Sequence, residues 1–374
     1  MKIIQVTPYY PPHLGGMEQR IRDLSERLAK KGHDVEVFTS NIRYPKNKQI
    51  KSTKNLKIHY LKSWEFAHTP IAPSLFFRLM RIPKDSIMHV HVSQPLVPEI
   101  AWLVSKLRGI PYVAHIRGDP DKSGKLGFLL PFYKKIFLKR VLKDSNKVIV
   151  LTKDYKYFIS KKYNLSLKKI TSIPNSTNFS IIQNNKKENN PKKKLLFVGR
   201  LSVQKNIPVL LESFNRLIKR NHNLELDIVG DGEEKEDIIN FINKNGLNNK
   251  VILFGRLEGK KLKKMYKNSD IFLLVSKDEG FSTTLLEAMA TSTPIIASDI
   301  LGTRSVIKKG YNGLLVKPTP ENIAEAIEKL IKNPKLRERL AKNGLKEVKK
   351  YSWNKIIAQT EKVYREVLKE HNKK

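Results

Sequence analysis

The sequence predicts an α/β protein built from two domains of similar size, and three observations support this. Short apolar runs alternate with amphipathic stretches along most of the 374 residues, as in parallel sheets covered by helices on both faces. Near the middle, residues 184–194 contain no apolar side chain, as is typical of a linker. The length also suits two separate cores. We therefore expect a first domain at 1–183, a linker at 184–194 and a second domain at 195–355, with a ligand cleft between the domains.

The first forty residues predict a strand, a loop, a helix and a second strand. Ile3–Val6 is apolar, Gly15-Gly16 ends a loop rich in helix breakers, and a helix starts at about Met17 and closes at Gly32, before a strand at 35–39. Further apolar runs in this half predict strands at 57–61, 87–92, 111–116 and 147–151, with helices at 98–107 and 131–142. The second half predicts strands at 195–198, 224–229, 251–254, 271–275 and 294–297, and helices toward its C-terminal end.

Composition excludes several classes of protein. The chain has no cysteine, which excludes disulfides, thiolate nucleophiles and cysteine-ligated metal sites. Hydrophobic residues make up 40% of the chain, too many for a wholly disordered protein. The N-terminus shows no secretory signal and no apolar run is long enough to span a bilayer, so we expect a cytoplasmic protein.

The charge is strongly basic. Seventy-two Lys and Arg residues against 35 Asp and Glu give a net charge of +37. Such an excess favours polyanionic partners, namely nucleic acid, anionic lipid or phosphorylated ligands. The many Lys, Asn and Ile residues are equally explained by a compositional bias. The charge is uneven, because residues 1–185 hold 33 basic and 12 acidic side chains, net +21, against net +16 in the rest.

Residues 270–290 carry the clearest chemical signal. An apolar strand ends at Ser276, an acidic loop contains Glu279, and Ser282-Thr283-Thr284 opens a helix that contains Glu287. The first amides of a helix bind phosphate, and carboxylates nearby accept hydrogen bonds from sugar hydroxyls. The alternative is structural: residues 284–287 also match a capping box, and Glu279 can be a solvated loop acid.

Two glycine-containing turns follow predicted strands. Gly199-Arg200 ends one strand and Lys205 lies just beyond, so two cations stand where they can hold a diphosphate. In so basic a chain, coincidence is the competing interpretation. Gly15-Gly16 lets the backbone approach a phosphate, although it can be only a turn. Gly230-Asp231-Gly232 is not a dinucleotide-binding fingerprint, since Lys235 stands in place of the third glycine.

Three histidines fall in predicted strands of the first half. His89 and His91 alternate along one strand and point to the same face. No further ligand lies at a suitable sequence spacing, so we expect core or hydrogen-bonding histidines rather than a metal site. His115 ends another strand, where it is better placed to meet a substrate.

Two segments are basic, apolar and aromatic, namely residues 74–84 and 125–143. Helices of this kind lie in the interface of an anionic membrane, or pack on a sheet while their lysines extend to solvent. We favour the membrane for residues 74–84, while packing explains residues 125–143 at least as well.

Taken together, the pattern resembles the retaining glycosyltransferases of family 4, which have the GT-B fold. The resemblance runs over nearly the whole chain. It rests on Gly15-Gly16, His115, Pro174-Asn175, Gly199-Arg200, Lys205-Asn206, Gly230-Asp231-Gly232, Glu279-Gly280-Phe281, Glu287-Ala288-Met289-Ala290, Pro294 and Asn312-Gly313-Leu314.

The resemblance implies two facing Rossmann-like domains, an N-terminal acceptor domain and a C-terminal nucleotide-sugar donor domain. It also implies that a final helix, at about 356–374, crosses back to the N-terminal domain. The reaction it implies transfers a hexose, with retention and without a metal ion or cofactor, from a UDP- or GDP-sugar. The acceptor would be a glycan or a lipid-linked molecule at the cytoplasmic membrane face.

The resemblance also implies roles for individual residues. Arg200 and Lys205 would hold the donor diphosphate, Glu279 the transferred sugar and Glu287 the ribose, with His115 beside the sugar. The donor site would be completed by the residues Gly15, Gly16, Phe281, Ser282, Thr283 and Thr284.

The chain departs from the family pattern at a few positions. Ser176 and Ser282 stand where glycine is usual, Asn178 stands for the frequent Asp, and Thr283-Thr284 replace bulkier apolar residues. None of these changes removes a presumed catalytic group, although Ser282 would alter contacts to the donor sugar.

Two alternatives stay open at this point. One is a GT-B-fold enzyme of other chemistry, such as a phosphorylase or an epimerase, which product analysis would separate. The other is a nucleic-acid-binding protein, which the charge alone allows but no recognition motif supports. Whether retention proceeds in one step or two is also open.

Overall fold

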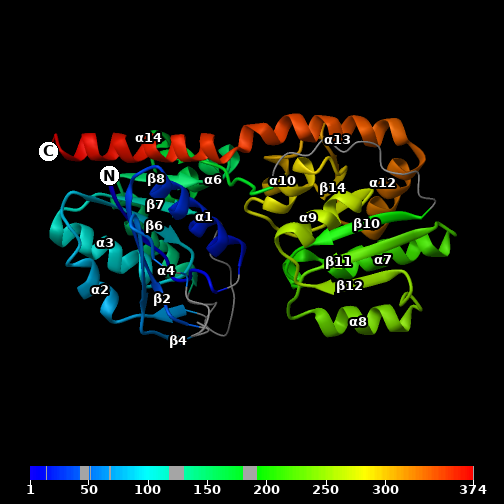
Figure 1. The fold of residues 1–374 in the computed structure, drawn as a ribbon, viewed down its shortest axis with the longest axis horizontal. Coiled ribbons are helices and arrows are strands. Elements are labelled where there is room, and N and C mark those ends of the chain that lie inside the picture. Colours follow the sequence, from blue (N-terminus) through cyan, green and yellow to red (C-terminus); the bar gives the residue numbers. More distant parts are fainter. Residues whose placement is uncertain are drawn as a thin grey trace. The chain divides into compact units, whose positions relative to one another are not determined.

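The computed structural model describes residues 1–13, 15–42, 50, 52–66, 69–117, 130–179 and 192–373. Contacts divide the chain into two compact units (Figure 1). Unit 1 comprises Met1–Asn175 and Asn354–Lys374, and unit 2 comprises Ser176–Trp353. Each unit has its own hydrophobic core.

Unit 1 is built on a parallel sheet in the order β3-β2-β1-β6-β7-β8-β9. Its central strands are buried on both faces: all seven residues of β6 are buried, including the polar Ser86, His89 and His91, whereas the edge strand β3 is only partly buried. The strands are β1 (Lys2–Val6), β2 (Asp34–Ser40), β3 (Leu56–Leu61), β6 (Ser86–Val92), β7 (Tyr112–Ile116), β8 (Lys147–Val150) and β9 (Ile170–Ser172), and β4 (Trp64–Phe66) pairs with β5 (Thr69–Ile71) in a separate hairpin.

The helices of unit 1 cover both faces of this sheet. They are α1 (Gly16–Lys30), α2 (Ser74–Leu79), α3 (Val97–Arg108), α4 (Leu130–Tyr133), the π-helix η2 (Lys134–Leu138), α5 (Lys139–Asp144), α6 (Lys153–Tyr163) and the short 3₁₀ turn η3 (Leu167–Lys169). The sequence predicts one helix at 131–142. The structure instead has α4, a π turn and α5 in succession there.

The C-terminal helix α14 (Trp353–His371) returns to unit 1 from residue 354 onward (Figure 1). Its apolar face is buried, including Tyr364, which is completely inaccessible. Glu361 on the same helix accepts hydrogen bonds from Lys31 and His33 just after α1, each at 2.8 Å. Helix α14 is therefore an integral part of unit 1.

Unit 2 contains a second parallel sheet, in the order β12-β11-β10-β13-β14-β15. Its strands are β10 (Lys193–Val198), β11 (Leu224–Val229), β12 (Val251–Gly255), β13 (Ile271–Leu274), β14 (Ile295–Ser298) and β15 (Leu314–Val316). Its helices are η4 (Val203–Lys205), α7 (Ile207–Lys219), α8 (Lys235–Lys244), α9 (Gly259–Asn268), α10 (Thr283–Ala290), α11 (Leu301–Arg304), α12 (Pro320–Lys332), α13 (Pro334–Val348) and η5 (Lys349–Tyr351).

The boundaries of the units differ from the expected ones. Unit 2 begins at Ser176, not after residue 183, because the Ser176 hydroxyl donates to the backbone carbonyl of Tyr351. Asn178 likewise accepts a hydrogen bond from the indole of Trp353, at 2.7 Å. Strand β10 begins at Lys193, so the last two residues of the expected linker are part of the sheet. Residues 184–191 of that linker lie outside the described residues.

Candidate active site

The loop after β10 is held by two glycines of the neighbouring strand's loop. Gly230 has a φ of +148°, and a Cβ there would lie 1.8 Å from the carbonyl oxygen of Gly199. At Gly232 a Cβ would lie 2.2 Å from the carbonyl oxygen of Leu201. The two loops are also joined by backbone hydrogen bonds at 3.0 Å. Gly230 and Gly232 therefore allow the close contact that holds the loop carrying Arg200. The sequence alone did not indicate this role for the two glycines.

The two cations expected to hold a diphosphate have different surroundings. The Arg200 side chain is 75% exposed and lies 3.4 Å from Glu233, which is also exposed. Lys205 ends η4 with its side chain only 17% exposed, and its ammonium group is paired with the Glu279 carboxylate. Arg200 is thus accessible to a ligand, whereas the charge of Lys205 is balanced within the protein.

Glu279 is held firmly in the loop after β13. Its carboxylate accepts from Lys205 and from the Ser276 hydroxyl, the latter at 2.7 Å. Gly302 of α11 packs so closely that a Cβ there would lie 1.9 Å from the Glu279 carbonyl oxygen. Glu279 is 9% exposed. The structure therefore does not support the alternative of a solvated loop acid.

Helix α10 begins directly after this loop, without a side-chain cap. Ser282 is the N-cap residue, yet its hydroxyl bonds to Thr284 Oγ1 at 2.7 Å rather than to a backbone amide. The capping box considered at residues 284–287 is not formed, because Thr284 lies inside the helix. The helix start, with Thr283 and Thr284, thus keeps the positive dipole end that binds anions.

Glu287 lies within α10 and is oriented by a tyrosine of α9. The Tyr266 hydroxyl donates to Glu287 Oε2 at 3.0 Å, and both side chains are buried. Burial, together with the charge of Glu287, raises the pKa of Tyr266 well above its ordinary value, so the phenol remains a donor. Nothing in the sequence indicates that Tyr266 contacts Glu287, since the two residues lie 21 positions apart and on different helices. Phe281 is buried, with its ring centroid 5.8 Å from that of Tyr351.

In unit 1, Gly15 and Gly16 stand at the start of α1. Gly15 is extended, and a Cβ there would come within 2.0 Å of the Glu18 carboxylate, which folds back over the turn. At Gly16 an added Cβ would meet nothing within 4 Å. The space beside Gly16 is therefore open to a ligand.

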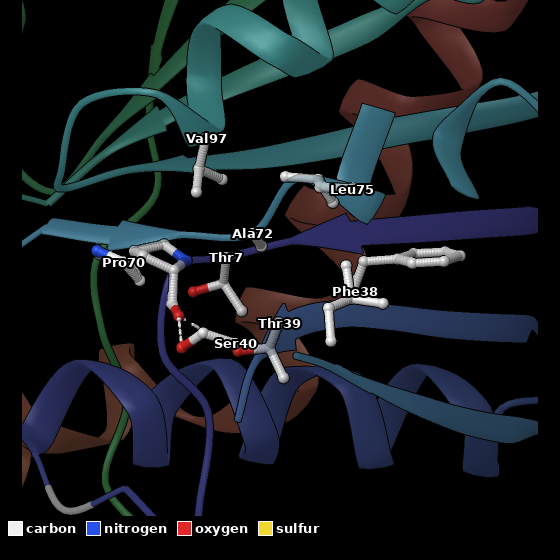
Figure 2. A pocket seen from close by; sticks show the side chains of 10 residues that line it. Thr7, Phe38, Thr39, Ser40, Pro70, Ala72, Leu75 and Val97 are labelled. Carbon is white, nitrogen blue, oxygen red and sulfur yellow. Dashed lines mark hydrogen bonds between the residues drawn. The ribbon is translucent and has the colours of Figure 1, made fainter. Parts of the chain in front are cut away.

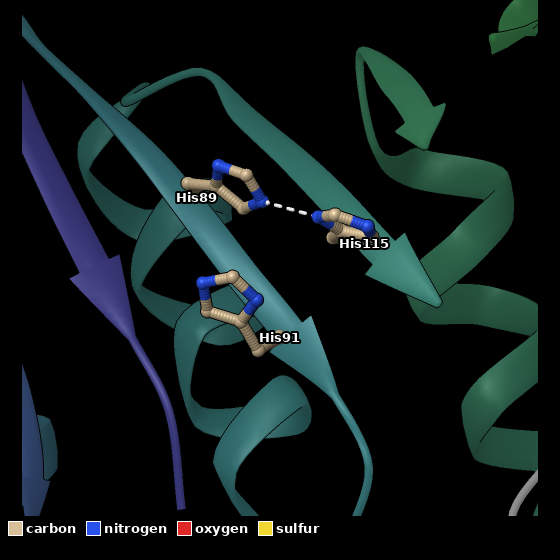
Figure 3. A group of neighbouring side chains, drawn as sticks. All are labelled: His89, His91 and His115. Carbon is tan, nitrogen blue, oxygen red and sulfur yellow. Dashed lines mark hydrogen bonds between the residues drawn. The ribbon is translucent and has the colours of Figure 1, made fainter. Parts of the chain in front are cut away.

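The three histidines are brought together on the sheet of unit 1. His89 and His91 share one face of β6 and stack at 4.4 Å, as expected. The tertiary structure adds His115 from the adjacent strand β7, so that one nitrogen of each ring lies within 4.8 Å of the others (Figure 3). No further ligand-type residue stands at a suitable spacing in the sequence, but pairing of β6 with β7 sets His115 opposite His91.

Comparison with known proteins identifies the family to which the chain belongs. The model of the family described as Glycosyltransferase Family 4 matches residues 14–180, and that of Glycosyl transferases group 1 matches residues 178–347. The chain belongs to the family 4, group 1 glycosyltransferases. An uncharacterized glycosyltransferase of Methanocaldococcus jannaschii is 29% identical, over 98% of both chains. The phosphatidyl-myo-inositol mannosyltransferase of Mycobacterium leprae is 25% identical, over 98% of this chain and 97% of its own.

Solved structures show the fold of this glycosyltransferase to be GT-B. Sucrose-phosphate synthase from Thermosynechococcus elongatus aligns with a TM-score of 0.81 and 20% identity, over 98% of both chains. Anabaena HepE in complex with UDP-glucose aligns with a TM-score of 0.74 and 15% identity, over 98% of this chain and all of its own.

A small cavity of the glycosyltransferase lies at the end of the sheet in unit 1 (Figure 2). It measures about 10 Å³, roughly the room that one water requires. The Ser40 hydroxyl beside it donates to the Pro8 carbonyl at 2.6 Å. Its lining was not anticipated from the sequence and comprises Thr7, Pro8, Phe38, Thr39, Ser40, Leu61, Pro70, Ala72, Leu75 and Val97. A sugar does not fit this cavity as it stands.

The two basic segments both pack on unit 1 and expose aromatic rings. In α2, Leu75 and Leu79 are buried while Phe77 is 64% exposed. In the second segment Leu138 is buried while Phe132 and Phe137 are exposed. Residues 125–129 of that segment lie outside the described residues. Among the helices that the structure describes, none is both long and apolar enough to cross a bilayer.

Proposed function

We propose that this glycosyltransferase moves a hexose from a UDP- or GDP-sugar to a glycan or lipid-linked acceptor at the cytoplasmic face of the membrane. The transfer would retain the anomeric configuration and need no metal ion. The observation that carries the donor assignment is the pair of buried, oriented glutamates around the uncapped start of α10. Glu279 is held by Lys205 and Ser276, and Glu287 by Tyr266. Carboxylates held in this way accept hydrogen bonds from the hydroxyls of a bound sugar or ribose.

The diphosphate of the donor would lie between Arg200 and the start of α10. Arg200 is exposed on a loop that Gly230 and Gly232 hold in place, so its guanidinium can form a bidentate contact with phosphate. The first amides of α10 would supply further donors. In unit 1, we also propose that the backbone of Gly16 contacts a phosphate of the donor, and the space beside this residue is open. These positive groups would do the work that a metal ion does in other transferases.

For the chemical step, we propose attack on the same face from which the nucleotide leaves. The anomeric C–O bond breaks, the acceptor hydroxyl bonds to the anomeric carbon, and its proton passes to an oxygen of the leaving diphosphate. Positive groups around the diphosphate stabilise the charge that develops as the bond breaks. Glu279 is a poorer covalent nucleophile than a free carboxylate, because Lys205 and Ser276 both donate to its Oε1 and draw negative charge from the group. This favours one step over a double displacement.

Relatives support the choice of donor and acceptor classes. One structural neighbour was solved with UDP-glucose, and one relative is a phosphatidyl-myo-inositol mannosyltransferase. We would first measure binding of UDP, GDP and a panel of their sugars by calorimetry, with Arg200→Ala as the variant. Saturable binding of one nucleotide class, lost in the variant, is expected. Absence of binding by every nucleotide would refute the donor assignment.

Transfer itself is tested with the donor so identified and candidate acceptors, with the anomeric configuration of the product read by NMR. A retained anomer, formed equally well with and without EDTA, is the expected result. An inverted product would refute retention, and loss of activity in EDTA that added metal restores would refute metal independence. Release of a sugar phosphate, or an isomerised donor, would point to a phosphorylase or an epimerase.

The membrane assignment rests on the exposed surface of η2 and α5. Four basic side chains, Lys135, Lys139, Arg140 and Lys143, surround a shallow groove of about 310 Å³. The exposed ring of Phe137 lies on the same helix, and α3, which packs beside it, exposes Leu103 and Leu107. Cations and exposed apolar side chains on neighbouring helices are the groups that an anionic lipid interface binds.

Vesicle co-sedimentation tests this surface. The triple variant Lys135→Gln, Lys139→Gln and Lys143→Gln should bind anionic vesicles about 100-fold more weakly, at about 1 kcal/mol per lysine. The matched control replaces three exposed lysines of α13, Lys335, Lys342 and Lys346, by Gln and should bind as the wild type does. Equal losses in the two variants, or wild-type binding indifferent to anionic lipid and salt, would contradict a membrane role for this surface.

A further inference from the structure

A chain of hydrogen bonds connects the C-terminal helix to His115. The Tyr364 hydroxyl of α14 bonds to His89 Nδ1, and His89 Nε2 bonds to His115 Nδ1 at 3.0 Å (Figure 3). Tyr364 and His89 are inaccessible and His115 is 5% exposed. His115 Nε2 is buried and has no hydrogen-bond partner among the residues that the structure describes. A buried polar atom without a partner, at the carboxyl end of β7, is where a ligand atom is expected.

The direction of these bonds follows from the groups around Tyr364. Gln5 accepts from His91 Nε2 through its Oε1, at 2.7 Å, and its Nε2 has no hydrogen-bond partner among the residues that the structure describes. His89 Nδ1 is the acceptor that lies within hydrogen-bond distance of the Tyr364 hydroxyl. If His89 donated instead, the buried phenol proton would have no acceptor among the described residues, so the phenol donates to His89 Nδ1.

The remaining protons follow because the rings are neutral. Burial, and then the charge of Arg117, lowers the pKa of His89 to about 3 and that of His115 well below its ordinary value. A neutral imidazole carries one N–H. If His89 accepts at Nδ1, its proton is on Nε2 and is donated to His115 Nδ1. The proton of His115 is then on Nε2.

We propose that Tyr364, acting through His89, holds His115 in the Nε2–H tautomer, so that His115 presents a hydrogen-bond donor at the carboxyl end of β7. Tyr364 and His89 are positioning residues in this scheme. The atom that receives the His115 proton rests on the proposed function and would be a hydroxyl or phosphate oxygen of the nucleotide-sugar.

The alternative is that His89, His91 and His115 are the three ligands of a metal ion. A hydrogen-bond relay from Tyr364 through His89 to His115 explains the cluster better than a metal site does, because both nitrogens of His89 are already engaged by Tyr364 and His115. The rings of His89 and His91 also stack at 4.4 Å. Stacked rings turn their faces toward one another, whereas metal ligands point in-plane lone pairs at one centre. The nearby Arg117 cation further disfavours a second positive charge.

The test is the tautomer of His115, read from long-range ¹H–¹⁵N correlation spectra of the full chain with ¹⁵N-labelled histidine. The His115 signal is assigned with His115→Asn. We expect the Nε2–H pattern in the wild type and a shift toward the Nδ1–H pattern in Tyr364→Phe. The control Tyr112→Phe removes another buried hydroxyl of unit 1, which donates to the Val141 carbonyl, and should leave the pattern unchanged.

Two variants of His89 test the middle of the relay. His89→Gln keeps an amide N–H near the position of Nε2 and should preserve the His115 pattern, whereas His89→Leu should lose it. An Nδ1–H pattern in the wild type, or an unchanged pattern in folded Tyr364→Phe, would overturn the relay. Titration with Zn²⁺ that shifts all three histidines and saturates at one equivalent would overturn it in favour of a metal site.

The spectra require no turnover, so the relay and the proposed function can fail separately. If the donor is a nucleotide-sugar, Tyr364→Phe should lower kcat about threefold to tenfold, as expected when one hydrogen bond is misdirected. An unchanged kcat with the expected tautomer shift would remove His115 from the reaction but not the relay from the structure.

Discussion

The ion pair between Lys205 and Glu279 gives the sharpest prediction about unit 2. Lys205→Met removes the cation and leaves Glu279, which is 9% exposed, with Ser276 as its side-chain donor among the residues that the structure describes. Breaking a buried pair by removing one partner costs about 3–5 kcal/mol. The hydrogen bond from Ser276 and the residual 17% exposure of Lys205 reduce this, so we expect a loss of about 2–4 kcal/mol.

Arg200→Met is the matched control, because it removes a cation from the same loop. Its side chain is 75% exposed and its partner Glu233 is 55% exposed, so the free energy of unfolding should change by less than about 0.5 kcal/mol. The two variants should thus differ in stability, while both weaken nucleotide binding.

Urea unfolding followed by circular dichroism measures the free energies. Hydrogen exchange of peptides that cover 271–290 assigns the loss to the site rather than to unit 1. Glu279→Gln and the double variant complete a double-mutant cycle. A cost for Lys205→Met no larger than that for Arg200→Met would refute the inference that the carboxylate is buried and dependent on its partner.

Three further predictions follow from the structure. Gly16→Ala meets open space at the start of α1, so stability should stay equal or rise by up to about 1 kcal/mol, while donor affinity measured by calorimetry should fall about tenfold if the diphosphate lies there. Tyr266→Phe should cost about 1.5–3 kcal/mol in urea unfolding, because it removes the donor to the buried Glu287 carboxylate. Asp227 is buried on β11, and burial raises its pKa to about 6. Because this folded pKa lies above the unfolded value, the stability that Asp227 contributes is complete below about pH 4 and is lost as the pH rises through 6. Asp227→Asn should therefore stabilise the protein by about 1–3 kcal/mol at pH 7.5 and make little difference at pH 4; equal effects at both values would contradict this.

Much of the fold could be read from local patterns. The central strands of both sheets are buried on both faces, so continuous apolar runs such as 271–274 stand out against the amphipathic helices between them. Strand β15 was missed because it has only three residues, and the π turn at 134–138 because it has the same apolar spacing as an α-helix. The boundary at Ser176 was missed because the contact that defines it reaches Tyr351, far along the chain.

The candidate site was also predictable only in part, because some of the contacts within it join residues that are far apart in the sequence. The sequence by itself predicted which residues would carry the chemistry of the proposed donor site, since Glu279, Glu287, Arg200 and Lys205 stand after recognisable strands or in the helix that follows. Only the tertiary structure decided their partners: Lys205 is neutralised by Glu279, and Glu287 is held by Tyr266. It also joined His115 to His89 and to Tyr364, 275 residues beyond His89. The physical reason is that strand and helix formation depends on neighbouring residues, whereas the pairing of buried polar groups depends on which strands and helices pack together.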